Sequence, residues 1–442
     1  MGRKPLDIEK IAMTLINTDD MAEKKKLAKK ISNLAYKKGI YLSSIHQFYI
    51  ARGKGEIAGG FTVPAINLRS MTYDLAKVIF RVAKRNNCGA FIFEIAKSEM
   101  GYTNQPPVEY SGVILAAALK EGYCGPVFIQ GDHFQANAKK YKEDPEKELA
   151  GIKALIVDAI EHGFYNIDID SSTLVDLGKS DLSKQQYDNY EVCAKLTQYI
   201  RQVQPRGVEV SVGGEIGEVG TKNSTCEDLH AFMSGFKSRL RKGRTGISKI
   251  SIQTGTSHGG VVLADGSIAQ VRLDFDTLKT LSKIAREEFG LAGAVQHGAS
   301  TLPAEAFHKF PETDTAEVHL ATEFQNMIYE SKHFPAELKA KIYEWLKVNA
   351  ASEKKEGETE EQFLYKTRKK ALGPFKKEIM GLAQQVRDAI ASEIENKFEF
   401  LFKQLNAVNN KELVDKYVTL KRVIMRKRQE KETVVHDGEG AD

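Results

Sequence analysis

Hydrophobic residues of this chain gather in short runs that recur at regular intervals between more polar stretches. Eight of the runs are rich in Val, Ile or Phe, and most end in Gly, Ser, Asp or Asn, a pattern typical of buried β-strands bounded by turns. We therefore expect strands within residues 59–68, 88–96, 125–133, 164–172, 207–217, 247–260, 292–300 and 316–324.

Helical patterns lie between these runs, with apolar residues at three- and four-residue steps. The clearest of them occupy residues 71–86, 144–163, 189–203 and 275–290. The second begins with Asp144, a residue type that caps helix N-termini, and the last ends in Gly290, as helices often do.

Eight strands that alternate with helices over about 265 residues predict an α/β fold, the (β/α)8 TIM barrel. The alternative architecture is a doubly wound parallel sheet. It would have fewer strands and usually a GxGxxG turn after the first strand, which the sequence lacks.

The segments on either side of the predicted barrel, residues 59–330, have helical patterns. Residues 1–58 include MAEKKKLAKKISNLAYKKG, a charged amphipathic helix, and are predicted to form an N-terminal helical extension. Residues 331–425 are predicted to form a C-terminal helical segment. The tail, residues 426–442, has little to bury and is predicted to be disordered.

Composition indicates a globular protein, with 42% hydrophobic and 28% charged residues. No apolar run approaches the roughly 18 residues of a membrane span, and the N-terminus lacks the apolar region of a signal peptide, so no membrane partner is expected. The four cysteines are far apart, which favours a cytoplasmic location. A net charge of +5 is too small to indicate a nucleic-acid partner.

Groups that can do chemistry collect on the predicted strands. Four of the ten histidines fall there, namely His133, His258, His297 and His319. Because active sites of TIM barrels form at the carboxyl ends of the strands, we expect these side chains to face one mouth. A lone histidine is more often a local hydrogen-bonding group, but three imidazoles can hold zinc and leave one coordination position for a substrate.

Acids and glycines accompany these histidines. The acids at the strand ends are Asp132, Asp170 and Glu215. Such carboxylates can support metal ligands or carry protons. The glycines next to the histidines, which could serve simply as turn residues, also have backbone N–H groups able to bind an anion such as phosphate.

Four short motifs occur in order along these strands: GDH at 131–133, GEIG at 214–217, GTSHG at 255–259 and HGAS at 297–300. Together they resemble the class II, metal-dependent ketose-bisphosphate aldolases, and the first strand, VPAINL, is similar to that of the family. The resemblance covers residues 55–325. It implies reversible aldol cleavage of a ketose 1,6-bisphosphate, fructose 1,6-bisphosphate above all, to dihydroxyacetone phosphate and an aldehyde phosphate.

The resemblance also implies a metal centre. His133, His258 and His297 match the zinc ligands of the family. Glu215 and Asp170 match carboxylates near the metal, and a second divalent or monovalent cation is conceivable there. With zinc as the Lewis acid, no lysine Schiff base is needed.

Further roles follow from the same match. Asp132 corresponds to the group that takes the proton of the C4 hydroxyl in cleavage and returns it in condensation. A second base moves the C3 proton of dihydroxyacetone phosphate; the loop after strand five offers Glu218, Glu227 and Asp228 for this task without deciding between them. The residues matched to substrate and phosphate binding are Gly259, Gly298, Ser300 and Thr322.

Some positions depart from the family pattern around the phosphate. The segment GGVVLADG after strand six lacks the Lys that the family commonly has there. On strand eight, His319 and Ala321 stand in place of an Asn that touches substrate and an Asp. After strand two, Ala96 stands where a Ser often binds phosphate. The basic side chain of Arg368 is a hypothetical replacement for the missing charge.

These departures keep alternatives open. The chain could be a non-catalytic aldolase-like subunit, or an aldolase for another sugar phosphate such as tagatose 1,6-bisphosphate. An unrelated barrel metalloenzyme fits the four ordered motifs less well, although barrels host many chemistries. Because members of the family are commonly dimers or tetramers, the resemblance also implies a homo-oligomer.

Overall fold

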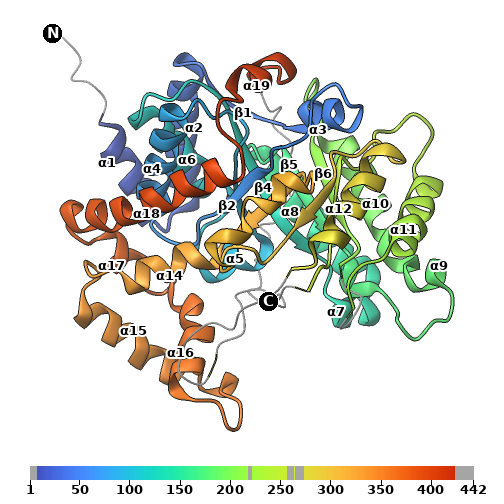
Figure 1. Ribbon diagram of the computed structural model, residues 1–442. Coiled ribbons are helices and arrows are strands. Elements are labelled where there is room, and N and C mark those ends of the chain that lie inside the picture. Colours follow the sequence, from blue (N-terminus) through green and yellow to red (C-terminus); the bar gives the residue numbers. More distant parts are fainter. Residues whose placement is uncertain (1–6, 218–221, 256–262, 264–272, 424–442) are drawn as a thin grey trace.

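The computed structural model describes residues 7–217, 222–255, 263 and 273–423. Its nine strands form one parallel sheet, in which β2 to β9 close into a barrel (Figure 1). The barrel strands are β2 (Val63–Asn67), β3 (Ile92–Ala96), β4 (Gly125–Gln135), β5 (Asn166–Asp170), β6 (Ser211–Glu215), β7 (Lys249–Ile252), β8 (Ala294–Gln296) and β9 (Glu317–Leu320). Each coincides with one predicted run, so the predicted TIM barrel is confirmed.

Helices follow the strands and cover the outside of the barrel (Figure 1). The longer ones are α4 (Thr72–Arg85), α6 (Pro107–Lys120), α8 (Pro145–Glu161), α10 (Tyr187–Val203), α11 (Cys226–Arg239) and α12 (Phe275–Glu287). The four predicted helices correspond to α4, α8, α10 and α12. The predicted cap is present, because the Asp144 carboxylate accepts a hydrogen bond from the Lys147 N–H at 3.1 Å.

The third predicted strand runs two residues further than expected, because β4 contains a bulge. Its pairing with β5 shifts between Gly131 and Phe134, so that Asp132 and His133 together oppose one residue of β5. His133 has a φ of 40°, which is uncommon for a residue with a side chain. Gly131 is required there, since a Cβ would lie 2.4 Å from the Phe134 ring.

The N-terminal extension is mainly helical, as predicted, but it also contains a strand. It consists of α1 (Ile8–Asn17), α2 (Met21–Lys37), β1 (Ile40–Ser43) and α3 (His46–Gly53). β1 pairs in parallel with the first half of β4. α3 packs against the amino-terminal end of the barrel, where the hydroxyl of the fully buried Tyr49 donates a hydrogen bond to Glu317.

The segment after the barrel is mainly helical over its described residues, as predicted. The last barrel strand is followed by α14 (Thr322–Glu330), and the segment itself comprises α15 (Ala336–Asn349), α16 (Glu360–Thr367), α17 (Lys376–Met380), α18 (Gln384–Gln404) and α19 (Lys411–Tyr417). α18 lies alongside α4 (Figure 1), where Arg387 Nε donates to Oδ2 of the fully buried Asp74 at 3.1 Å. The predicted disordered tail, 426–442, lies outside the described residues.

One hydrophobic core joins the barrel to the C-terminal helices. The rings of Phe91, just before β3, and Phe402, on α18, have centroids 5.6 Å apart. A smaller apolar cluster closes the amino-terminal end of the barrel and includes Phe48 of α3 and Val414 of α19. Across the described part of the chain, no helix is both long and apolar enough to cross a membrane.

Candidate functional site

A cavity opens at the carboxyl ends of β2, β3, β4, β8 and β9. Six of the residues selected from the sequence line it: Asp132, His133, His297, Gly298, Ser300 and Thr322. They come from separate parts of the chain, but the carboxyl ends of parallel barrel strands all meet at one mouth. The fold therefore brings most of the predicted site together.

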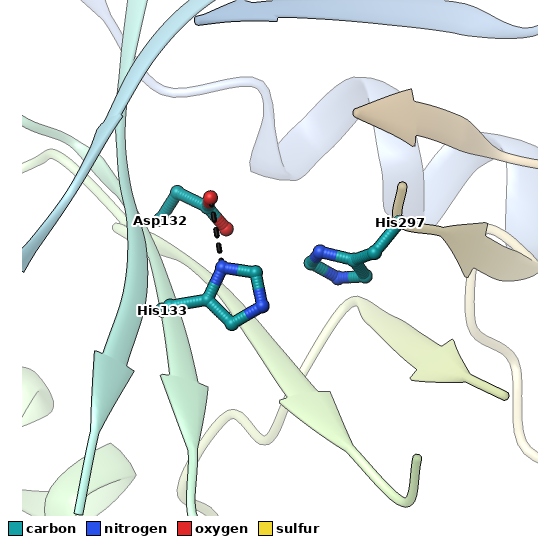
Figure 2. A group of neighbouring side chains, drawn as sticks. All are labelled: Asp132, His133 and His297. Atoms are coloured by element: carbon teal, nitrogen blue, oxygen red, sulfur yellow. Dashed lines mark ion pairs between the residues drawn. The ribbon is translucent and has the colours of Figure 1, made fainter. Parts of the chain in front are cut away.

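Asp132, His133 and His297 face one another across this mouth (Figure 2). Nδ1 of His133 lies 2.8 Å from Oδ2 of Asp132, and the ring centroids of His133 and His297 are 4.4 Å apart. One ligand atom from each of the three residues lies within 4.8 Å of the other two. The Ser251 hydroxyl, 2.8 Å from Nε2, holds the His297 ring in place.

Electrostatics fix the protonation of the Asp132–His133 pair. Burial raises the pKa of Asp132, but the imidazoles of His133 and His319 outweigh burial and hold that pKa well below its usual value. Burial lowers the pKa of His133, whereas the carboxylates of Asp132 and Glu215 raise it well above its usual value. Asp132 is therefore a carboxylate, and His133 Nδ1 donates a hydrogen bond to it.

Glu215 and Asp170 lie near the other nitrogen of His133. Nε2 of His133 is 3.9 Å from Oε2 of Glu215, and His133, Asp170 and Glu215 each offer one ligand atom within 4.8 Å of the others. For comparison with this 3.9 Å, two donors that bind one tetrahedral zinc at about 2.0–2.2 Å lie about 3.4 Å from each other. Burial and the facing carboxylate of Asp170 raise the pKa of Glu215 well above its usual value.

This donor set fits a divalent metal ion. Imidazole nitrogens and carboxylate oxygens are the ligands that zinc takes in proteins. The hydrogen bond from Nδ1 to Asp132 leaves His133 Nε2 as the ligand atom, the arrangement in which a carboxylate orients a metal-binding histidine. His258, the third predicted ligand, and Gly259 lie outside the described residues.

The opposite wall of the cavity suits an anion. Gly298 has a φ of 65°, a conformation that favours glycine. The Ser300 hydroxyl accepts a hydrogen bond from the Glu323 N–H at 3.3 Å, in the first turn of α14, and Thr322 is the first residue of that helix. Because the N–H groups at the start of a helix carry partial positive charge, this wall can bind a phosphate.

His319 lines the same cavity and lies in a cluster of acids. Its Nδ1 is 3.2 Å from both Glu94 Oε2 and Asp132 Oδ1, and its Nε2 is 2.7 Å from Glu317 Oε1. Burial lowers the pKa of His319, but Glu94 and Asp132 raise it well above its usual value. His319 is therefore an imidazolium that partly neutralises the acids next to Asp132.

Inside the barrel, one layer of side chains below the mouth, a buried ion network replaces the usual aliphatic side chains. Lys249 Nζ lies 2.9 Å from Asp168 Oδ2 and 2.7 Å from Gln130 Oε1, and it also pairs with Glu317. Lys249 is 1% exposed and Glu317 is fully buried. Burial raises the pKa of Asp168 to about 6 despite the nearby Lys249 ammonium. The network places a cation among acids that would otherwise repel one another.

The three acids considered for the C3 proton differ in their surroundings. Asp228 forms a capping box at the start of α11, where its carboxylate accepts from the N–H of Thr225 at 3.0 Å. Glu227 is exposed in the first turn of the same helix. Glu218 lies outside the described residues. Asp228 is thus engaged in holding the helix start.

Arg368, proposed from the sequence to supply charge for phosphate, binds other residues of the protein instead. It is 4% exposed, and Nη2 donates to Asn326 Oδ1 at 2.5 Å and to Glu330 Oε1 at 3.0 Å. Its guanidinium stacks 4.5 Å above the Tyr365 ring. It does not line the described cavity, so the hypothesis for Arg368 has no support in the structure.

Other residues of the cavity were not selected from the sequence. They are Asn67, Arg69, Glu94 and Glu99. A signal was present for Asn67 and Glu94, because polar residues occupy the ends of the first two predicted strands as well as the later ones, whereas Arg69 lies just past its predicted strand. Glu99 lies beyond its strand, in α5 (Lys97–Tyr102), and only the fold brings it to the mouth.

Comparisons with known proteins agree with this architecture. The chain matches the family described as class-II fructose-bisphosphate aldolase over residues 56–405, which reaches past the barrel into α18. Fructose-bisphosphate aldolase from Campylobacter jejuni is similar in structure, with a TM-score of 0.50 and 18% identity, over 84% of this chain and 97% of that chain.

A probable tagatose 6 phosphate kinase from Sinorhizobium meliloti 1021 is also similar, with a TM-score of 0.54 and 14% identity, over 80% of this chain and 99% of that chain. At these identities the two structures show the shared fold alone. The comparison with curated proteins finds no matching sequence.

Proposed function

This chain belongs to the class-II fructose-bisphosphate aldolase family, and we propose that it is a metal-dependent aldolase that reversibly cleaves a ketose 1,6-bisphosphate. The first substrate proposed is fructose 1,6-bisphosphate, with dihydroxyacetone phosphate and an aldehyde phosphate as products. Tagatose 1,6-bisphosphate, which differs in stereochemistry, is the second.

One observation carries the proposal. Asp132, His133 and His297, which can bind a metal and move a proton, share a single cavity with Gly298 and Ser300, which can bind a phosphate. Aldol cleavage of a sugar phosphate needs both functions within one substrate length. The cavity combines them at the mouth of the barrel.

Cleavage breaks the bond between C3 and C4 of the ketose. Asp132 takes the proton of the C4 hydroxyl, so that C4 becomes the carbonyl carbon of the aldehyde. The electron pair of the broken bond passes toward the C2 carbonyl as an enediolate, and protonation at C3 then gives dihydroxyacetone phosphate. Glu218 and Glu227 are the acids proposed for this second proton transfer, because Asp228 caps α11.

The metal proposed for this site is zinc, with His133, His297 and, by its motif, His258 as ligands. When bound there, zinc would supply a Lewis acid for the C2 carbonyl. The protein holds the ligands in position, since Asp132 fixes the orientation of His133 and Ser251 that of His297. Glu215 and Asp170 are proposed as further carboxylates near the metal.

A substrate screen tests the proposal. Purified protein with added zinc is given fructose 1,6-bisphosphate, tagatose 1,6-bisphosphate or sedoheptulose 1,7-bisphosphate, and release of dihydroxyacetone phosphate is followed with a coupled assay. We expect cleavage of at least one, its loss with EDTA, its return with zinc, and no trapping of protein by borohydride. Activity that survives complete removal of metal would exclude the proposal. The His133→Ala variant serves as the inactive control.

A second candidate is a non-catalytic subunit that supports another aldolase. The surroundings of His319 favour it, because this imidazolium lines the cavity and lies 3.2 Å from Oδ1 of Asp132, the proposed acid–base group. Zinc well below one per chain, together with no cleavage of any ketose phosphate, would support this candidate. Stoichiometric zinc with turnover would exclude it. Oligomeric state, expected to be a dimer or tetramer, is a separate measurement by light scattering.

A further inference from the structure

The cavity wall that can bind a phosphate needs a positively charged side chain, and none of the wall residues identified from the sequence motifs provides one. A phosphate monoester carries a charge of about −1.5 to −2 at neutral pH. Gly298, Ser300 and Thr322 are all neutral. Neutral donors alone hold a dianion less tightly than donors joined by a cation, because they leave its charge uncompensated.

Arg69 is placed where this charge is needed. It follows β2 by two residues and lines the cavity together with Ser300 and Thr322. Its Nη1 donates to the Thr322 hydroxyl at 3.4 Å, so the guanidinium reaches the first residue of α14. The side chain is 11% exposed, which leaves it in contact with the mouth and largely shielded from solvent.

Glu99 holds the guanidinium in one orientation. Arg69 Nε donates to Glu99 Oε1 at 2.7 Å. The other oxygen of this carboxylate, Oε2, accepts from Asn67 Nδ2 at 2.6 Å and from the Ala96 N–H at 2.7 Å. A carboxylate tied by three donors is rigid, so it fixes the plane of the guanidinium, and the two Nη groups at the end of an arginine are a pair suited to the oxygens of a phosphate.

Two small residues share the cavity lining with this arginine. Ala96 and Ala321 line the cavity with Arg69. These are two of the positions at which the chain departs from the family pattern, where a Ser and an Asp are common. The absence of an Asp at position 321 also removes a negative charge that would compete for the guanidinium. The departures around the phosphate are therefore consistent with one another.

We propose that Arg69 binds the substrate phosphate through its Nη groups, as the fourth member of an anion site with Gly298, Ser300 and Thr322. It takes the place of the lysine that the segment after strand six lacks. The identity of the ligand as a sugar phosphate rests on the proposed function; the anion site itself does not. The competing explanation is that Arg69 serves only to neutralise Glu99.

The variants separate these explanations. Arg69→Met removes the charge but leaves Glu99 buried without its cation, which can unfold the protein. Arg69→Met combined with Glu99→Gln removes both charges and keeps the amide able to bond Asn67. Arg69→Lys keeps the charge without the two-pronged geometry. The control is Arg286→Met, which breaks an ion pair with Asp314 on the surface of α12.

Two readouts are needed. The first is the dissociation constant of inorganic phosphate, measured by calorimetry on the full chain after circular dichroism has confirmed the fold. The double variant should raise it about tenfold or more, as expected for loss of a charged hydrogen-bonding group. Arg69→Lys should give a smaller rise, and Arg286→Met none. Phosphate binding by the double variant as tight as in the unmodified protein would overturn the proposal.

The second readout is cleavage of the ketose bisphosphate. We expect KM to rise about tenfold or more in the double variant, because the phosphate is bound in the ground state as well as in the transition state. Unchanged KM and unchanged phosphate binding in an active enzyme would disprove the role of Arg69 alone. Arg69-dependent phosphate binding in a protein that cleaves no ketose phosphate would disprove the proposed function and leave the anion site standing.

Discussion

Nδ1 of His133 donates a hydrogen bond to Oδ2 of Asp132, its neighbour in the sequence, across 2.8 Å. Adjacent residues of a regular strand point to opposite faces of the sheet and could not meet in this way. The bulge in β4 removes that restriction, because both residues oppose a single residue of β5. A local irregularity of one strand thus creates the acid–imidazole pair of the site.

This pair leads to a prediction about metal binding. His133→Ala should lose zinc, because it removes a proposed ligand. Asp132→Ala should keep zinc at saturating concentration but bind it about 10–100-fold more weakly, since the carboxylate orients His133. Turnover at saturating zinc should fall about 10²–10⁴-fold in Asp132→Ala, as expected for loss of a general acid–base group.

The measurements are competition with a chelator of known zinc affinity and kcat at saturating zinc. Asp132→Asn, which can still accept the hydrogen bond from Nδ1, should retain more zinc affinity than Asp132→Ala while losing turnover to a similar degree. Full activity in Asp132→Ala would show that the proton is handled by another group.

The ion network inside the barrel predicts a large effect on stability. Lys249→Met removes the ammonium that faces Asp168 and Glu317 and leaves these two buried acids with His319 as their nearest cation. The free energy of unfolding should fall by about 3–5 kcal/mol in urea titrations. Lys279→Met, at an exposed position on α12, should change it by less than about 0.5 kcal/mol. A loss in the Lys249 variant no larger than in this control would mean that water reaches the network.

Acid should destabilise the protein through protonation of His46. In the sequence this residue is far from the proposed metal ligands. Its side chain is 3% exposed, and its Nδ1 has no hydrogen-bond partner among the described residues. Burial, aided by the charge of Arg201, lowers the pKa of His46 to about 3. The unfolded chain therefore binds a proton below a pH of about 6.5 that the folded chain does not, and stability falls as the pH drops from there toward about 3.

Through His46 alone, the free energy of unfolding should fall by about 2 kcal/mol between about pH 7 and about pH 5. Urea midpoints at the two pH values measure it. His46→Gln should be less stable than the unmodified protein at neutral pH yet lose less on acidification. His308→Gln, at an exposed position, should retain the full acid sensitivity. If His46→Gln lost as much stability on acidification as the unmodified protein, other groups would be the cause of the acid sensitivity.

The shared core predicts that the C-terminal helices do not unfold by themselves. Phe402 is fully buried against Phe91 of the barrel, so Phe402→Ala should lower the free energy of unfolding of the whole protein by about 3–5 kcal/mol. Val348→Ala, at a position 78% exposed on α15, should cost less than about 0.5 kcal/mol. Two separate transitions, with the barrel transition unchanged, would instead define the segment 331–425 as an independent domain.

Much of this architecture could be predicted from the sequence because its signals are periodic. The eight barrel strands and helices such as α8 have the spacing that their burial requires, and Asp144 marks a helix start. The mouth residues Asp132, His133 and His297 followed from the rule that such groups gather at the carboxyl ends of barrel strands.

The features that escaped prediction depend on contacts distant in sequence. β1 has only four residues, too few for periodicity to separate a strand from a loop, and its partner Gly125 lies far along the chain. Arg69 follows its strand without any motif, and it gains a role only because Glu99 and Thr322 are folded next to it. The bulge at Asp132 leaves no signal in an apolar pattern.

The position of β1 has a consequence for association between molecules. β3 occupies one side of β4, while the other side is shared by β1 along the first half and β5 along the second. Without β1, residues 125–128 would present unpaired backbone groups, a template for strands of other chains. The four residues of β1 cover that template and end the sheet in a short edge. Residues 40–43 thus satisfy backbone groups of an exposed edge, the kind of edge that pairs with strands of other chains.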